Sequence, residues 1–308
     1  MSVGAIDIGT NSTNLLVVDD DGRTLERVVT VTRLGRGVDS SRRLADDSMD
    51  RTLECLRDYA RVFERHGVAK ARVTATSAVR DAANRREFTD RVRAMSGFEL
   101  ELLSGPDEGR LAHLGATLGL EIPEGPHLVI DIGGGSTEIV LGLRSNGSTT
   151  MNTARSIDVG AVRLTERHLA SDPPRPEELV NAIGDTYDLL DDLIRDEPDL
   201  ASAKQLIGTS GTIVTVAAVE VGQRTFDPSA LHGMELTRAA VEDVFRTLAT
   251  ESLADRLHNP GLPHDRADVI VGGCCVLVAL MRRWDAPHVT VSAHNILDGI
   301  CAELLGSW

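Results

Sequence analysis

The sequence predicts an α/β protein made of two similar halves. Aromatic residues are only 3% of the 308 residues, whereas hydrophobic residues are 42%, so the interior must be built mainly from aliphatic side chains, which suits sheets covered by helices. An internal repeat supports the same class. The segment 5–17 matches the segment 129–141 with identical Ile, Asp, Ile, Gly, Ser and Thr, at a constant offset of 124 residues. A repeat of domain size implies two equivalent domains that hold a ligand between equivalent loops.

The first half is predicted to open with a strand, a polar loop and a return strand, followed by alternating strands and helices. Apolar residues recur with helical spacing between Ser48 and His66, and Gly67 follows as a helix stop. The expected strands are 3–8, 15–18, 24–32, 72–76 and 98–103. The expected helices are 48–66, 84–96 and 107–118.

The second half restarts the pattern after the linker candidate Glu121–Pro126, which holds two prolines and a glycine. The expected strands are 127–132, 139–143 and 205–208, and the expected helices are 176–195, 213–219, 238–250 and 295–305. The apolar run Val269–Met281 has 13 residues, too few to span a bilayer, and is expected to be a buried helix. We therefore predict domains at 1–124 and 125–308, with the option that the helix 295–308 packs back on the first domain.

Composition excludes several classes of function. A formal net charge of -15 argues against binding of nucleic-acid polymers and of membrane surfaces, because both need basic faces. The cysteines are too few and too oddly placed for a disulfide framework or a zinc site; they are Cys55, Cys274, Cys275 and Cys301. Asp7 and Gly9 interrupt the first apolar segment, so we expect no signal peptide and a cytoplasmic protein.

Three loops rich in glycine and hydroxyl groups follow predicted strands. Missing side chains let backbone N–H groups approach phosphate oxygens, hydroxyl groups add donors, and the third loop opens a helix whose positive end favours anions. Three such loops, two of them duplicated, predict phosphate binding. The candidate residues are Gly9, Thr10, Asn11 and Ser12, then Gly133, Gly134, Gly135, Ser136 and Thr137, then Thr209, Ser210, Gly211 and Thr212.

Two aspartates lie inside the apolar strands that precede the duplicated loops. A buried carboxylate without compensation costs several kcal/mol, so Asp7 and Asp131 call for a cation. Mg²⁺, which bridges carboxylate and phosphate oxygens, is the expected cofactor, and Glu138 can face the same pocket as Asp131. The alternative is that the two aspartates only cap the hydrogen bonds of their own turns.

At these motifs the sequence resembles the exopolyphosphatase and guanosine-pentaphosphate phosphohydrolase family, part of the superfamily of actin, sugar kinases and Hsp70. The matching elements are AIDIGTNS at 5–12, TSAVRD at 76–81, SGPDE at 104–108, VIDIGGGSTE at 129–138 and GTSGT at 208–212. The resemblance implies two ribonuclease H-like (actin-like ATPase) domains with a cleft between them. It also implies that Glu108 orients or deprotonates the attacking water. Arg33 and Arg80 are candidate cations at the rim of the cleft.

The sequence departs from the family pattern at three points. Gly109 follows Glu108 where the family has Ala, and Leu297 stands where the family has Arg. A lost phosphate contact at Leu297 would weaken the grip on long polyanions and favours short chains or another phosphorylated ligand. The chain is expected to be the short form, without the C-terminal helical HD-type domain of longer members.

The predicted function is that of an exopolyphosphatase, which releases orthophosphate from the end of inorganic polyphosphate or of another phosphoanhydride. Three alternatives stay open: a guanosine pentaphosphate 5'-phosphohydrolase, a non-hydrolytic phosphate or nucleotide sensor, and a sugar-type kinase in which Gly272 and Gly273 admit an adenine ring. The oligomeric state also stays open, with a homodimer as one alternative.

Overall fold

The computed structural model describes residues 1–306 and separates them into two compact units. The first unit contains Met1–Gly115 together with the described residues from Ile296 onward, and the second contains Ala116–Asn295. The sequence-based division put residues 116–124 in the first half, whereas here Ala116, Leu120 and Ile122 pack on the sheet of the second unit. The last helix, α12 (Ile296–Leu305), belongs to the first unit.

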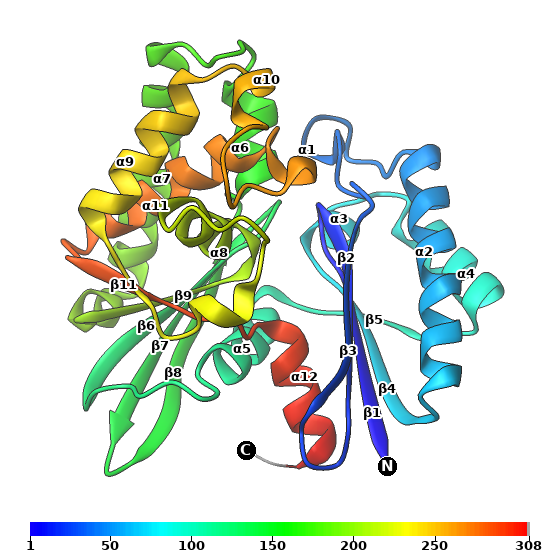
Figure 1. The fold of residues 1–308 in the computed structure, drawn as a ribbon. Coiled ribbons are helices and arrows are strands. Elements are labelled where there is room, and N and C mark those ends of the chain that lie inside the picture. Colours follow the sequence, from blue (N-terminus) through cyan, green and yellow to red (C-terminus); the bar gives the residue numbers. More distant parts are fainter. Residues whose placement is uncertain (307–308) are drawn as a thin grey trace. The chain divides into compact units, whose positions relative to one another are not determined.

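The first unit is built on a five-stranded sheet in the order β3-β2-β1-β4-β5 (Figure 1). β1, β4 and β5 are parallel, while β1, β2 and β3 form an antiparallel meander. The strands are β1 (Ser2–Ile8), β2 (Ser12–Val18), β3 (Thr24–Val31), β4 (Val68–Ala75) and β5 (Leu100–Leu102). The helices are α1 (Val38–Ser41), α2 (Asp46–Arg65), α3 (Ser77–Arg80), α4 (Arg85–Ser96), α5 (Gly105–Ala116) and α12.

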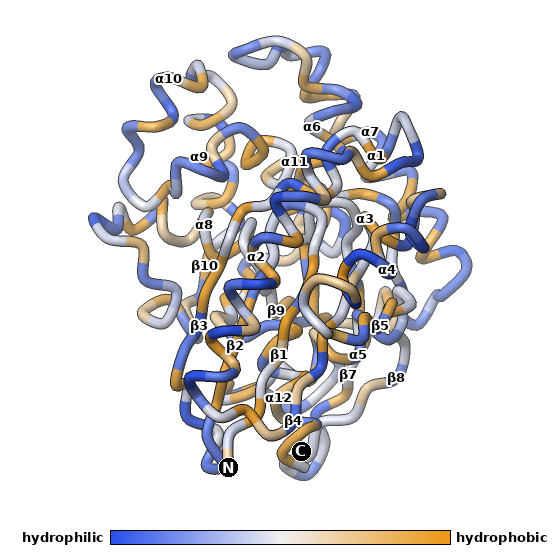
Figure 2. Tube along the Cα trace, turned by 90° about the vertical axis from the view of Figure 1, so that its right-hand side faces the viewer, coloured by the Kyte–Doolittle hydropathy of each residue, from blue (hydrophilic) through white to orange (hydrophobic). Residues whose placement is uncertain are grey.

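The two faces of this sheet are covered by different helices because side chains alternate along a strand. Ile6 and Ile8 point into one cluster with apolar residues of α2 and α4. Val3 and Ala5 point to the opposite face, into a cluster with α5 and α12. Figure 1 shows α2 and α4 on one side of the sheet and α12 on the other. In Figure 2, blue and orange stretches alternate along α2, as expected for a helix with one buried side.

The second unit repeats this arrangement and adds one strand. Its sheet has the order β10-β11-β9-β6-β7-β8, in which β6, β9 and β11 are parallel and β6, β7 and β8 form the antiparallel meander. Read from the other edge, its first five strands take the places of β3, β2, β1, β4 and β5. The strands are β6 (Gly125–Ile132), β7 (Thr137–Ser145), β8 (Ser148–Ile157), β9 (Gln205–Thr209), β10 (Glu235–Thr237) and β11 (His288–Val291).

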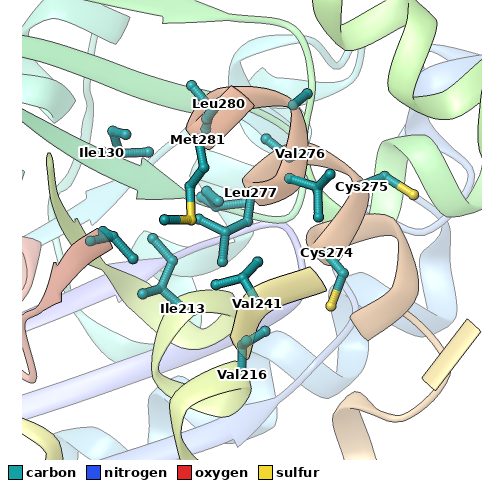
Figure 3. Packing of buried hydrophobic residues seen from close by; sticks show 14 of the residues in the cluster. Ile130, Ile213, Val216, Val241, Cys274, Cys275, Val276, Leu277, Leu280 and Met281 are labelled. Carbon is teal, nitrogen blue, oxygen red and sulfur yellow. The ribbon is translucent and has the colours of Figure 1, made fainter. Parts of the chain in front are cut away.

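One large core fills the second unit on the side of Leu128, Ile130 and Ile132. The apolar run that the sequence marked as a buried helix is α11 (Ile270–Arg283), and Figure 3 shows its side chains packed against Ile130, Ile213 and Val241. The other helices are α6 (Ala161–His168), α7 (Pro176–Asp196), α8 (Ser210–Glu220), α9 (Arg238–Thr250) and α10 (Leu253–Arg256), with short 3₁₀ turns at Pro198–Ser202, Pro228–Leu231 and His264–Arg266. Within residues 1–306, no helix has the length and apolar character needed to cross a membrane.

The predicted α/β class with two ribonuclease H-like halves is confirmed, and the differences lie at the loops. Ser12 and Thr13 pair with Val31 and Thr30, so the polar turn of the first half is shorter than predicted. Thr137 likewise pairs in the sheet, with Ile157. The sequence pattern missed β8, β10, β11, α1, α3, α6 and α10, because a polar edge strand and short elements carry little hydrophobic periodicity.

Candidate functional site

In the first unit, three of the singled-out motifs follow the carboxyl ends of neighbouring parallel strands. The Thr76 amide donates to the Ile8 carbonyl (3.3 Å), and the Leu103 amide donates to the Ala75 carbonyl (3.0 Å). Because parallel strands end at one edge of a sheet, the segments after β1, β4 and β5 are brought together there. Those segments carry the Gly9 loop, Arg80 and Glu108, in the place where α/β sheets bind ligands.

The Gly9 loop is closed by its own backbone and supported from behind. The Gly9 amide donates to the Ser12 carbonyl (2.9 Å), and the Thr10 hydroxyl lies 3.0 Å from that of Ser77 at the start of α3. The side-chain amide nitrogen of Asn11 is buried and has no hydrogen-bond partner among residues 1–306. A buried donor left without a partner is costly, so Asn11 is suited to an acceptor that arrives with a ligand.

Glu108 and Arg80 form an ion pair at this edge. Glu108 lies in the first turn of α5, where its amide donates to the Ser104 carbonyl (2.9 Å), and it is 8% exposed. Nη1 of Arg80 lies 3.2 Å from Oε2 of Glu108 and donates to the Leu103 carbonyl at 3.0 Å. The guanidinium is therefore fixed by the backbone of the segment that carries the glutamate.

Asp7 lies one step back from the edge, inside β1. It accepts a hydrogen bond from the Thr74 hydroxyl (3.1 Å), and its cross-strand neighbour is Asn14. In the second unit the equivalent pair is Asp131 opposite Glu138. The duplicated position thus holds one carboxylate in the first unit and two in the second.

The second unit gathers its loops by the same geometry. β6, β9 and β11 are parallel, and the Ser292 amide donates to the Gly208 carbonyl (2.8 Å). The Gly133 amide donates to the Ser136 carbonyl (3.0 Å), which reproduces the closure of the Gly9 loop. Thr137 is fully buried, and its hydroxyl donates to the Val159 carbonyl (2.7 Å), so this hydroxyl supports the loop from inside the unit.

The third predicted loop is the first turn of α8 and not a separate loop. Thr209 ends β9, and Ser210 begins the helix with a left-handed φ of 70°. Such a backbone is strained for a residue with a side chain, and strained residues gather at functional sites. The Ser210 side chain favours the ionised form of the Asp131 carboxyl, so this turn brings a hydroxyl near the buried carboxylate.

Arg266 lies against this turn, and the sequence did not single it out. A Cβ built on Gly211 would lie 1.8 Å from Nη1 of Arg266, so the guanidinium occupies the space that the glycine leaves open. Its side chain has no hydrogen bond or ion pair within residues 1–306, and burial lowers its pKa. The charge of the adjacent Asp265 only partly offsets this desolvation. A desolvated cation without an ion pair, placed on a turn rich in hydroxyl groups, is suited to an anion. No spacing rule points to Arg266, because its partner Gly211 is far away in the sequence.

Asp131 and Glu138 form the one buried carboxylate pair among the predicted metal ligands. They are opposite residues of β6 and β7 and point to the same face, with exposures of 7% and 1%. The Ser156 hydroxyl donates to Glu138 (2.8 Å), and burial raises the pKa of Asp131 to about 6. Mg²⁺ is usually bound by one or two carboxylates, and water or phosphate oxygens fill the remaining coordination positions, so this pair matches its preference.

A different acidic group satisfies a stricter distance test. Within residues 1–306, only Asp19, Asp20 and Asp21 bring three metal-ligating side chains within 4.8 Å of one another. This group lies on the β2–β3 hairpin, where Asp19 accepts hydrogen bonds from the amides of Asp21 and Arg23. It serves its own turn and lies at the end of β2 (Ser12–Val18) opposite to the Gly9 loop.

Three other singled-out residues belong to packing. A Cβ on Gly272 would lie 2.5 Å from the Ala161 carbonyl oxygen, and one on Gly273 would lie 2.6 Å from the Thr212 side chain, so α6 and α8 fill the space proposed for an adenine ring. Leu297 is 2% exposed and lies in the core cluster on the α12 side of the first sheet.

Two glycines behind the duplicated loops were also missed. Gly35 and Gly160 follow the third strand of each meander, and a Cβ on either would lie within 3 Å of the loop in its own unit. The signal was present, since Arg33-Leu34-Gly35 and Asp158-Val159-Gly160 continue the internal repeat with one inserted residue.

Known proteins are similar to this chain in sequence and fold over nearly its whole length. The family model described as Ppx/GppA phosphatase family matches residues 15–307. Exopolyphosphatase 2 of Mycobacterium tuberculosis is 36% identical, with 99% of this chain and 98% of the relative covered. The crystal structure of an exopolyphosphatase-like protein superimposes with a TM-score of 0.93 at 32% identity, covering 99% of both chains. The Aquifex aeolicus PPX-GPPA enzyme gives a TM-score of 0.79 at 29% identity, covering 100% of this chain and 99% of that one. The chain therefore belongs to the Ppx/GppA phosphatase family and is a phosphoanhydride hydrolase.

Proposed function

We propose that this enzyme is an exopolyphosphatase that removes the terminal phosphate of inorganic polyphosphate. The observation that carries the proposal is the Arg80–Glu108 ion pair at the carboxyl edge of the first sheet, next to the Gly9 loop. A cation that can hold a phosphate oxygen and a carboxylate that can hold water are there fixed side by side. The exopolyphosphatase names of relatives such as that of Mycobacterium tuberculosis support the choice of substrate.

In the proposed reaction, the loops and cations bind the phosphates and Glu108 directs the water. The donors are the backbone amides of the Gly9, Gly133 and Ser210 segments, the Asn11 amide, Arg80 and Arg266. Water attacks the terminal phosphorus while the bond to the bridging oxygen breaks, and the bridging oxygen keeps the electron pair. Glu108 takes the proton of the water, so the products are orthophosphate and a chain shorter by one phosphate.

We propose Mg²⁺ as the cofactor, held by Asp131 and Glu138. When bound, it would neutralise charge on the phosphate oxygens. The buried pair fits this role, because a divalent cation would offset the cost of two desolvated carboxylates. Asp7 faces Asn14 across the strands and accepts a hydrogen bond from the Thr74 hydroxyl, and its part in metal binding stays a prediction.

The proposal is tested by orthophosphate release from tripolyphosphate with Mg²⁺. We expect Glu108→Gln to lower kcat by about 10²–10⁴-fold, because that is the range of a lost general base, and to change KM far less. Glu101→Gln is the matched control, since Glu101 is an exposed residue of the same unit that pairs with Arg72. A Glu108→Gln enzyme with the kcat of the wild type would refute the role of Glu108.

The same assay separates the alternatives. A higher kcat/KM on guanosine pentaphosphate than on tripolyphosphate would favour the nucleotide phosphohydrolase. Tight binding of either ligand by the wild type without phosphate release would favour a sensor. Phosphate transfer from ATP that depends on an added sugar would favour a kinase.

A further inference from the structure

The first turn of α6 holds the Gly133 loop by its carbonyl groups. The amides of Ala161 and Val162 donate to the carbonyls of Gly133 and Gly134, both at 2.9 Å. The amide of Arg163 donates to the Gly134 carbonyl as well, at 3.1 Å. The positive end of this helix is therefore occupied by the loop itself and is closed to a ligand.

Arg163 adds a side-chain contact to the same face of the loop. Its Nε donates to the Gly135 carbonyl at 2.6 Å, and the residue is only 5% exposed. Consecutive carbonyls of the loop, from Gly133 to Gly135, thus accept from one short stretch of chain. A buried guanidinium on a backbone carbonyl makes a strong, charge-assisted hydrogen bond.

This arrangement fixes the direction of the loop's N–H groups. In a planar trans peptide the N–H points opposite to the C=O of the same unit. Because the carbonyls of Gly133, Gly134 and Gly135 point at α6, the amides of Gly134, Gly135 and Ser136 point away from it. None of those three amides donates to a protein group within residues 1–306. They are the donors that a phosphate needs.

Gly160 makes the close approach of α6 possible. A Cβ at this position would lie 2.7 Å from the carbonyl carbon and oxygen of Gly134, which are rigid backbone atoms. In the first unit, different residues form equivalent hydrogen bonds to the carbonyls of the Gly9 loop. There the Thr10 carbonyl accepts from the Gly35 amide (2.8 Å) and the Asn11 carbonyl from the Arg33 amide (2.8 Å).

We propose that Arg163 and Gly160 are positioning residues for phosphate binding, which act by holding the carbonyl side of the Gly133 loop so that its amides face the substrate. The inference rests on the proposed function for the identity of the substrate, whereas the hydrogen-bond geometry around the Gly133 loop is independent of that function. When these hydrogen bonds to the loop carbonyls are lost, the peptide planes of the loop can rotate, so fewer amides donate to the phosphate. Affinity for substrate then falls more than kcat.

Two variants and two matched controls test this. We expect Arg163→Met to raise the KM for tripolyphosphate by about 10–100-fold, the loss expected for a hydrogen bond to a charged group, with a smaller change in kcat. Arg163→Lys restores part of the affinity, because an ammonium can still donate to the Gly135 carbonyl. Gly160→Ala raises KM at least as much. The controls are Arg155→Met, at an exposed ion pair, and Gly184→Ala, where a Cβ meets nothing within 4 Å.

Amide hydrogen exchange of Ala161 and Val162, measured without substrate, separates this inference from the proposed function. Faster exchange in Arg163→Met and Gly160→Ala, but not in the controls, supports the positioning role even if the wild-type protein neither binds nor hydrolyses polyphosphate. Unchanged exchange and unchanged KM in both variants would overturn it, whatever the substrate proves to be. An equal loss of kcat and affinity that follows only the fall in Tm, without rescue by Arg163→Lys, would also overturn it.

Discussion

At the scale of single residues, the candidate site contains charged side chains that are buried and therefore poorly solvated. Asp131 lies on a buried strand position, and its desolvation raises the pKa of its carboxyl from 3.8 to about 6, partly countered by the Ser210 hydroxyl. Arg266 is a cation that burial disfavours and that no carboxylate pairs with inside residues 1–306. Burial of both charges lowers the stability of the folded protein, a cost that is common at functional sites.

The Asp131 carboxyl should make stability depend on pH in a defined sense. Its folded pKa is raised, so the carboxyl costs nothing below the unfolded pKa of 3.8 and costs most above about pH 6, where it must ionise while buried. In EDTA we expect Asp131→Asn to raise the free energy of unfolding at pH 8 by on the order of 1–3 kcal/mol, and by about half as much at pH 5, where the carboxyl is only partly ionised in the folded state. Urea unfolding at both pH values measures this, with the exposed Asp188→Asn of α7 as control. Equal effects at the two pH values would contradict the prediction.

Removal of the Arg266 charge should separate stability from binding. Without an anion the guanidinium is desolvated and unpaired, so we expect Arg266→Met to leave Tm unchanged or raise it. The same variant should weaken tripolyphosphate binding by about 10-fold or more, since a hydrogen bond to a charged group is lost. Thermal unfolding and isothermal titration on one preparation check both halves. A fall in Tm together with unchanged affinity would show that Arg266 is a structural residue.

At the scale of elements, short segments at the carboxyl edges hold the binding groups in place. The turn that carries Arg266 is held by α10, because Nη1 of Arg256 donates to the Ala267 carbonyl (2.9 Å). Nη2 of Arg256 donates to Asp172 (2.7 Å), whose carboxylate also accepts from the Leu253 amide at the start of α10. Arg256 is 4% exposed. A buried guanidinium thus connects α10 and the following turn at Ala267 with the distant segment that carries Asp172.

We expect Arg256→Met to destabilise the protein by roughly 2–4 kcal/mol, because it leaves buried acceptors without their donor. Asp172→Asn should cost less, since Asp172 is 49% exposed in its ion pair with Arg256 and water can replace the lost interaction. Both variants should raise the KM for tripolyphosphate through displacement of Arg266. Urea midpoints and steady-state kinetics test the ranking, and a larger loss of stability in Asp172→Asn than in Arg256→Met would be inconsistent with it.

At the scale of the whole molecule, the chain is a duplicated sheet whose copies have diverged in chemistry. Both units close the first loop by the same hydrogen bond and support it from the segment after the third strand. The second unit has Glu138 where the first has Asn14, and the first unit has the Arg80–Glu108 pair. The proposed reaction therefore divides its tasks, with metal binding assigned to one unit and water activation to the other.

The proposed division of tasks predicts that residues of each unit contribute to the reaction. We expect Asn11→Ala and Ser136→Ala each to lower kcat/KM for tripolyphosphate by roughly 5–30-fold, and the double variant to lose about the product of the two effects, because separated sites contribute additively. Steady-state kinetics of the four proteins measures this. A wild-type value in either single variant would mean that the corresponding unit takes no part in binding.

The sequence determined the fold class and most of the candidate residues, for a local reason. Strand-loop-strand motifs carry their hydrophobic pattern, their glycines and their buried aspartate within about a dozen residues, and the repeat between Asp7 and Asp131 reveals the duplication. The family motifs assign Glu108 in the same way. Each of these signals can be recognised in the sequence alone.

Only the tertiary structure decided which groups support or join the loops. Arg266 meets Gly211, Arg163 meets Gly135, and Arg256 meets Ala267 through contacts between separate segments. Arginine is frequent in this chain, so its positions alone do not distinguish a solvated side chain from a buried one. What separates them is desolvation and the fixed direction of backbone carbonyls, and both exist only once the sheets have formed.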